Sequence, residues 1–225
     1  MSTVTFDLFS ALLDSRAGGG AAFARLAREH RWECDGEEVY DAWDARNKAA
    51  QRDCAQWVPY TTLAHTALAD AYRSLGLAAD PADVDRDLSS LLDSLPEWEL
   101  WPDVADVLPA LTEEHRVGIL SNVDDDLFAR TRVAGLVDPE LVVTSERLGV
   151  YKPDPGIYHG ARQLLGPMVH VATSGRDVRG ALEAGMAVIR LRRPGHRLDP
   201  DGTSPPHEAA GMVELRKRLA QVSAR

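Results

Sequence analysis

Hydrophobic and polar residues follow two different patterns along the chain, one before and one after residue 100. From Ala21 to Leu95 the apolar side chains recur every three or four positions, which is the spacing of one helix face. The residues with this spacing are Phe23, Leu26, Ala27, Val39, Trp43, Ala50, Leu63, Ala67, Leu68 and Tyr72. The spacing is interrupted near Asp35-Gly36, Pro59, Gly76 to Pro81, and Pro96. We therefore predict four helices and no strand in this part of the chain.

After residue 100, short strand-like runs alternate with helical stretches. The predicted strands are 116–120, 141–144, 169–172 and 187–191, and a further β-prone run, 4–6, opens the chain. The predicted helices are 103–114, 153–165, 177–184 and 208–224. The run Asp124-Asp125-Asp126 is interpreted as the acidic first turn of another helix, where carboxylates suit the helix dipole. We also predict a loop at 194–206 and a flexible hinge at Gly18-Gly19-Gly20.

Helices that alternate with strands in this way cover both faces of a parallel sheet. The sequence therefore predicts an α/β protein with a Rossmann-like, doubly wound parallel sheet. The core domain is expected to comprise residues 1–16 and 99–225, and an all-helical domain, residues 17–98, is expected to be inserted into it. A chain of 225 residues is long enough for one such core and an insertion.

The balance of charge limits the partners that the chain can bind. Thirty-five acidic and 25 basic residues give a formal net charge of −10, which repels nucleic acid and anionic membrane surfaces. We expect neither as a partner, and a homodimer is left open. No apolar run approaches the roughly 20 residues of a membrane helix, and the N-terminus lacks a signal-peptide pattern, so a cytoplasmic protein is expected. Cys34 and Cys54 are not spaced as a zinc or redox pair and are expected to be reduced.

Polar side chains that can do chemistry follow several of the predicted strands. In an open α/β sheet, ligands bind outside the carboxyl ends of the strands. Taken alone, Asp7 is better explained as a turn cap than as a nucleophile. Together, however, the strand-end residues supply a carboxylate nucleophile, neutral donors, a cation and a second carboxylate: Asp7, Ser10, Ser121, Asn122, Lys152, Thr173, Ser174 and Asp177.

These residues lie in four motifs that resemble those of the haloacid dehalogenase superfamily of aspartate-nucleophile hydrolases. The motifs are Phe6-Asp7-Leu8-Phe9-Ser10-Ala11-Leu12-Leu13-Asp14, Gly118-Ile119-Leu120-Ser121-Asn122, Tyr151-Lys152-Pro153-Asp154-Pro155 with Tyr158, and Asp177 followed by Gly180-Ala181-Leu182-Glu183-Ala184-Gly185. The resemblance covers nearly the whole chain. It implies that the helical insertion is the cap domain of this superfamily.

The resemblance also favours one branch of the superfamily. Phosphatases of the superfamily carry a second aspartate two residues after the nucleophile, where this chain has Phe9, and an acid where it has Thr173. A halide leaves without a proton or a metal, so the pattern is similar to that of the metal-independent 2-haloacid dehalogenases. Two alternatives stay open. One is a magnesium-dependent phosphatase of small phosphate esters with metal ligands at Asp7, Phe9 and Asp177, and the other is a catalytically impaired binding protein.

The resemblance implies the following roles for a small, anionic substrate and no cofactor. Asp7 would form an ester with the substrate, which water then cleaves, and Lys152 and Asp177 would assist as the other catalytic residues. Lys152 would keep Asp7 ionised, and Tyr158 and Asp177 would orient Lys152 or the attacking water. The predicted substrate-binding residues are Leu8, Phe9, Ser10, Arg46, Ser121, Asn122, Tyr158 and Ser174.

Several positions depart from the dehalogenase pattern. Ala11 replaces a threonine, and Ala172 and Ser174 replace a serine and an asparagine. The arginine expected after Trp43 to receive the halide is Asp44, whose charge would repel a carboxylate substrate. Arg46 is the candidate substitute, although two residues along a helix turn a side chain by about 200°.

Overall fold

A six-stranded parallel sheet forms the centre of the computed structural model, which describes residues 1–198 and 202–222. Its strand order is β3-β2-β1-β4-β5-β6, and every pair of neighbours is parallel. The strands are β1 (Thr3–Phe6), β2 (Arg116–Ser121), β3 (Val142–Thr144), β4 (Met168–Ala172), β5 (Ala187–Leu191) and β6 (Glu208–Ala209). The strand order reverses at β1, so the carboxyl ends of β1 and β4 border the crevice where such sheets bind ligands.

Helices cover both faces of this sheet, as predicted. On one face α5 (Pro102–Glu114) and α10 (Met212–Val222) pack on each other, and on the other α8 (Pro155–Leu165) packs beside α9 (Gly175–Glu183). The side chains of β2 show the strand period of two, since Ile119 belongs to the first of these hydrophobic cores and Leu120 to the second. The α/β fold class is therefore confirmed.

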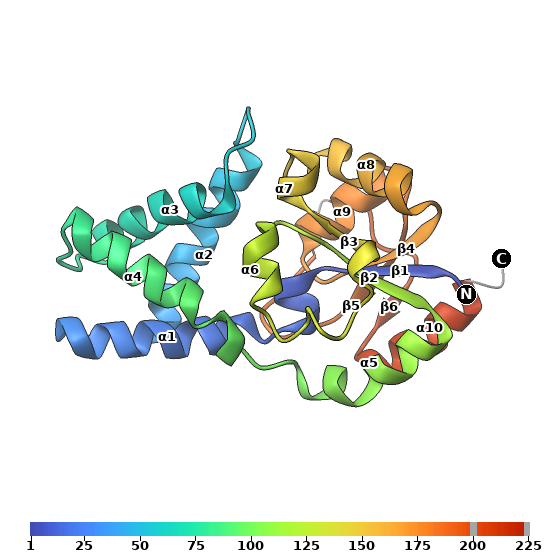
Figure 1. Cartoon of the computed structure of the whole chain (residues 1–225), viewed down its shortest axis with the longest axis horizontal. Coiled ribbons are helices and arrows are strands. Elements are labelled where there is room, and N and C mark those ends of the chain that lie inside the picture. The colour runs from blue at the N-terminus through green and yellow to red at the C-terminus, as the bar shows by residue number, and fades with distance from the viewer. Residues whose placement is uncertain (199–201, 223–225) are drawn as a thin grey trace.

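The four predicted helices before residue 95 are confirmed, and Figure 1 shows them gathered to one side of the sheet. They are α1 (Ser15–His30), α2 (Gly36–Arg52), α3 (Tyr60–Ser74) and α4 (Pro81–Asp93), which we call the cap helices. Asp80 begins α4 with a capping box and Pro81 stands at its first position, two sequence signals for a helix start. The predicted boundary between residues 16 and 17 falls inside α1, and the division into two domains stays a prediction.

The shorter elements connect the strands and the cap helices. They are η1 (Leu8–Leu12), η2 (Leu95–Glu97), α6 (Asp125–Ala129), η3 (Pro139–Leu141) and α7 (Ser145–Leu148). Among the described residues no helix is both long and apolar enough to cross a membrane.

The predicted hinge at Gly18-Gly19-Gly20 is wrong, because all three residues lie inside α1. A Cβ atom built on Gly18 would lie 2.5 Å from the indole of Trp98, and one on Gly19 would lie 2.2 Å from the ring of Tyr40. The glycines therefore allow aromatic rings to pack directly against the helix backbone. At these positions glycine indicates close packing and not flexibility.

Several predicted boundaries also need correction. The helix predicted at 153–165 begins at Pro155, after the cap residue Asp154, and the helix predicted from 177 begins at Gly175, after the cap residue Ser174. Of the helix predicted at 208–224, Glu208–Ala209 form β6 and the helix starts at Met212. Residues 223–224 of that prediction, and 199–201 of the predicted loop, lie outside the described residues.

Candidate active site

Asp7 lies directly after β1, at the start of the turn η1. Its backbone N–H still donates to the carbonyl of Val171 in β4, at 3.1 Å, so the residue is fixed to the sheet. Its carboxylate oxygen Oδ2 accepts hydrogen bonds from the hydroxyl of Ser10, at 2.6 Å, and from the Ser10 backbone N–H, at 3.3 Å. Asp7 therefore caps the turn after β1 and, at the same time, presents its carboxylate at the end of that strand.

Lys152 joins this carboxylate to a second one. Its ammonium Nζ lies 2.9 Å from Asp7 Oδ1 and 2.6 Å from Asp177 Oδ2, and the residue is buried. The backbone of Lys152 is fixed by Asn122, whose amide accepts from the Lys152 N–H at 2.7 Å and donates to its carbonyl at 3.1 Å. Ser121 donates to Asp7 Oδ1 at 3.3 Å. The strand-end residues thus meet at one point, as the topology predicts.

Asp177 accepts hydrogen bonds from three buried side chains. Besides Lys152, these are the Tyr158 hydroxyl, at 2.9 Å, and His170 Nε2, at 3.1 Å. Burial raises the pKa of Asp177, but the charges and hydrogen bonds of Lys152 and His170 outweigh it and leave the pKa well below its usual value. Asp7 behaves similarly. Burial raises its pKa, and Lys152 and the Ser10 hydroxyl bring it below the usual value, so both carboxylates are ionised at neutral pH.

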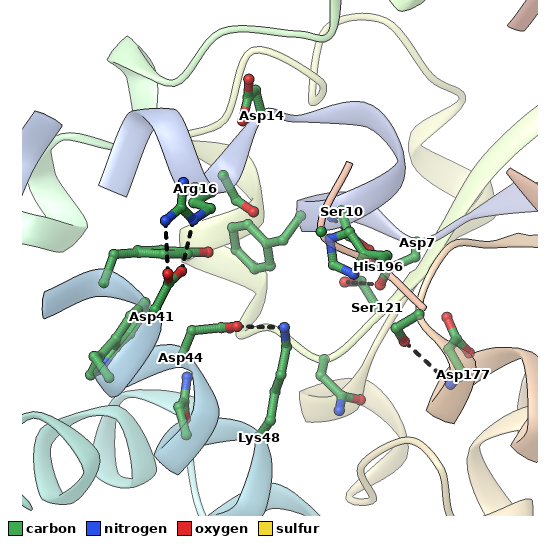
Figure 2. A pocket seen from close by; sticks show the side chains of 18 of the residues that line it. Asp7, Ser10, Asp14, Arg16, Asp41, Asp44, Lys48, Ser121, Asp177 and His196 are labelled. Atoms are coloured by element: carbon green, nitrogen blue, oxygen red, sulfur yellow. Dashed lines mark hydrogen bonds and ion pairs between the residues drawn. The ribbon is translucent and has the colours of Figure 1, made fainter. Parts of the chain in front are cut away.

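A cavity of about 790 Å³ opens from Asp7 towards the cap helices. Its inner wall includes Ser10, Ser121, Asn122, Lys152, Ser174 and Asp177, and its outer wall comes mainly from α2. Phe9 also lines it, with its ring packed against Tyr60 and Trp98 at centroid distances of 6.4 and 6.0 Å. Ser174 caps α9 and accepts from the Asp177 N–H at 3.3 Å. The outer mouth carries Asp14, Arg16 and Asp41, where Arg16 pairs with Asp41 (Figure 2).

Three residues predicted to bind substrate do not line this cavity. The side chain of Leu8 is fully buried in the hydrophobic core, and that of Tyr158 lies behind Asp177. Arg46 is also absent from the cavity wall, and its guanidinium donates to the Ala42 carbonyl on its own helix at 2.8 Å. The structure thus does not place Arg46 where it could substitute for the missing arginine, because two residues along α2 turn it away from the cavity. Its role in binding stays a prediction.

The cavity instead receives a cation that the sequence did not indicate. Lys48 lies one helical turn after Asp44, and its Nζ is 2.5 Å from Asp44 Oδ2 (Figure 2). The carboxylate of Asp44 is therefore neutralised by its neighbour rather than free to repel an anion. Arg176, the second residue of α9, also lines the cavity and donates to the Lys48 carbonyl at 2.6 Å. Burial lowers the pKa of Arg176.

Sequence reasoning also missed two histidines. His170 lies inside β4, fully buried, and its Nδ1 is 3.1 Å from the Thr5 hydroxyl while Nε2 contacts Asp177. A polar residue in a buried strand was the available signal. His196 lies in the loop after β5 and lines the cavity. No spacing relates His196 to the four motifs.

The residues at this site do not fit a bound magnesium ion. Both oxygens of Asp177 are occupied by the lysine, tyrosine and histidine contacts, and the ammonium of Lys152 lies between Asp177 and Asp7. Phe9 offers no side-chain oxygen. The hydroxyl of Thr173 is buried without a partner in the part of the chain that the structure describes, and a hydroxyl is a weak substitute for an acid.

An open α/β sheet with a buried carboxylate–lysine–carboxylate group at its carboxyl edge defines this chain as a candidate hydrolase with an aspartate at its centre. A family model described as haloacid dehalogenase-like hydrolase matches residues 1–185. The chain belongs to this family.

Individual relatives show which members of this family the chain is similar to. The chain is 28% identical over 173 residues to (S)-2-haloacid dehalogenase 4A of Burkholderia cepacia, covering 74% of this chain and 73% of that one. It is 29% identical over 128 residues to the pyrimidine 5'-nucleotidase YjjG of Escherichia coli strain K12, and the match covers 53% of this chain and 56% of that one. Among solved structures, a defluorinating L-2-haloacid dehalogenase superposes with a TM-score of 0.80 at 26% identity, over 98% of this chain and 95% of that one. The chain is thus a hydrolase of this superfamily with 2-haloacid dehalogenases among its relatives.

Proposed function

We propose that this protein hydrolyses the carbon–halogen bond of a small 2-haloacid through a covalent ester on Asp7. The observation that carries the proposal is the contact of Lys152 Nζ with both Asp7 and Asp177, combined with Phe9 in the position of the phosphatase acid. This arrangement supplies an ionised nucleophile and, at the position of Phe9, no acid to protonate an alkoxide leaving group in the first step. A halide leaving group needs no such donor.

In the first step, formation of the Asp7 ester, each side chain of the site would have a separate role. Asp7 Oδ attacks the halogen-bearing carbon, the carbon–oxygen bond forms, and the carbon–halogen bond breaks with its electron pair on the halide. Lys152 holds Asp7 as a carboxylate. Ser121 and the N–H groups near Asn122 would bind the substrate carboxylate. Arg176 would provide positive charge for the leaving halide, because the ammonium of Lys48 is paired with Asp44.

A magnesium-dependent phosphatase is the second candidate, and the likeness to a nucleotidase favours it. The contacts of Asp177 and the side chain of Phe9 count against it, since they leave few oxygen ligands for a metal. A non-catalytic binding protein is the third. It would have no need of a buried lysine between two ionised carboxylates, because burying such charges is costly unless they serve a purpose.

The decisive experiment is a screen of short 2-haloacids and small phosphate esters, with and without excess chelator. We expect halide release from at least one 2-haloacid, unchanged by chelator, and no phosphate release. Asp7→Asn should reduce halide release by a factor on the order of 10⁴ or more, as for other deleted nucleophiles, while Asp14→Asn at the cavity mouth should retain most of it. Phosphate release that is lost with chelator and restored by magnesium would favour the phosphatase instead.

A further inference from the structure

The second half of the proposed reaction needs a base, and Asp177, which is expected to orient Lys152 or the attacking water, is poorly suited to take a proton from that water. Water must lose a proton as it attacks the ester of Asp7. A general base works best when its pKa lies near the working pH. The oxygens of Asp177 accept hydrogen bonds from Lys152, Tyr158 and His170, and its pKa is held well below the usual value. A carboxylate stabilised in this way has little tendency to accept a proton.

His196 lines the same cavity, and its imidazole makes no hydrogen bond to any other described residue. Among the described residues, only its backbone makes hydrogen bonds, from its N–H to the Arg193 carbonyl and to its carbonyl from Arg190. Figure 2 shows the ring directed into the cavity on the side of Asp7 and Ser10. It is half-buried, so water in the cavity can reach it.

The loop that carries His196 is fixed to the segment that carries Asp7. The buried guanidinium of Arg193 donates twice to the Ala11 carbonyl in η1, at 2.9 and 3.2 Å, and once to Asp103 at 2.8 Å. Gly195 then adopts a φ of 78°, a left-handed conformation that suits glycine, before the chain reaches His196. These contacts position the imidazole relative to the nucleophile without touching the ring itself.

We propose that His196 is the general base that activates water for hydrolysis of the Asp7 ester. This role rests on the proposed dehalogenase function. A ring nitrogen of the neutral imidazole takes one proton from water as the water oxygen bonds to Cγ of Asp7. The tetrahedral intermediate then breaks its bond from Cγ to the ester oxygen, which takes the proton back from the imidazolium and leaves as a hydroxyl. The second proton of the water is released to solvent when the carboxyl group of Asp7 ionises.

The charges around the imidazole favour its neutral form. Burial lowers the pKa of His196, and Lys48 on α2 and Arg190 on β5 lower it further. The carboxylates of Asp7 and Asp44 oppose this effect without reversing it. The ring is therefore unprotonated, and able to accept a proton, at neutral pH.

The test follows both halves of the reaction with (S)-2-chloropropionate as the probe. In His196→Gln the first turnover should release about one chloride per active site at nearly the parent rate. Steady-state turnover should then fall by a factor on the order of 10²–10⁴, the usual contribution of a general base. Mass spectrometry of quenched enzyme should find the ester on the peptide that contains Asp7. Added imidazole should restore part of the turnover of His196→Ala. His159→Gln, an exposed histidine on α8, is the matched control and should behave as the parent protein.

Different failures have different meanings. Unchanged steady-state turnover in both His196 variants, or a slow first turnover without accumulated ester, would overturn the role of His196 and leave the proposed function standing. Absence of chloride release and of an Asp7 ester in the parent protein, with this probe and with the other 2-haloacids of the screen, would overturn the proposed function itself and this role with it.

Discussion

At the scale of single residues, the contact between Lys152 and Asp7 allows a prediction about pH. Asp7 must be ionised to attack, so activity falls as the pH drops through its pKa. Burial raises that pKa, and Lys152 is the largest influence that lowers it. In Lys152→Met the folded-state pKa of Asp7 should therefore rise, and the acidic limb of the kcat/KM profile for halide release should move to higher pH.

Lys152→Met should also lower the plateau rate, because Lys152 holds Asp7 and Asp177 in place. Lys217→Met is the matched control, since Lys217 is exposed on α10 and far from the motifs. An unshifted acidic limb in Lys152→Met, with an unchanged plateau, would contradict the role of the ammonium.

The residues of the site differ in how well the sequence predicts them. Parallel strands bring their carboxyl ends to one edge. Asp7, Ser121 and Lys152 could be placed together because Asp7 follows β1, Ser121 ends β2 and Lys152 lies in the connection that follows β3. Lys48 and His196 could not. Their positions depend on how α2 and the loop after β5 pack over that edge, which local sequence patterns do not specify.

At the scale of elements, the predicted strands and most helices were confirmed, because hydrophobic period and proline or glycine breaks report on local structure. The errors have physical causes. Glycines that serve close packing in α1 were read as a hinge, and β6 was missed because two residues carry too little pattern to predict a strand. The fold class was therefore predictable, while helix starts near cap residues were not.

The packing of α1 leads to a second prediction. Alanine normally stabilises a helix relative to glycine by about 1 kcal/mol. In Gly19→Ala the new methyl group would meet the Tyr40 ring at 2.2 Å, and overpacking of this kind costs about 1–3 kcal/mol. We expect Gly19→Ala to lower the free energy of unfolding, measured by denaturant titration.

Gly135→Ala is the control for this experiment. A Cβ atom at Gly135 would meet no other atom within 4 Å, so its stability should be unchanged or slightly higher. A stabilised Gly19→Ala protein would show that the ring of Tyr40 can move aside, and that the close contact does not determine the choice of glycine.

At the scale of the whole molecule, hydrogen bonds connect the segment of the cap helices to the residues around the carboxyl edge of the sheet. Asn122 donates to Gln51 at 2.9 Å, and Tyr151 donates to the Val58 carbonyl at 2.8 Å. Arg176 makes a third connection, to the carbonyl of Lys48. Gln51 and Lys48 also line the cavity. These bonds therefore fix the position of α2 over the strand ends and, with it, the shape of the cavity.

Asp124 makes the connection that is most accessible to experiment. The sequence predicts that Asp124 belongs to the acidic first turn of a helix, yet its carboxylate makes no cap bond to α6. Instead it accepts from the N–H groups of Tyr60, at 2.9 Å, and Thr61, at 3.2 Å, at the start of α3. The residue before α3, Pro59, gives no side-chain cap of its own. Asp124, which lies outside the cap helices, therefore satisfies the first N–H groups of α3.

Removal of this carboxylate should loosen the cap helices from the sheet. Asp124→Ala removes the partner of the buried Tyr60 N–H and of the partly buried Thr61 N–H, and loss of a helix cap costs about 0.5–2 kcal/mol. We expect a lower free energy of unfolding by that amount, faster hydrogen exchange at the start of α3, and a higher KM, since Tyr60 lines the cavity. Asp126→Ala, which removes an exposed partner of Arg130 on the same helix, should change stability by less than about 1 kcal/mol and leave KM unchanged. Equal effects of the two substitutions would show that Asp124 contributes only as a surface charge, and that the cap helices are held by their hydrophobic contacts alone.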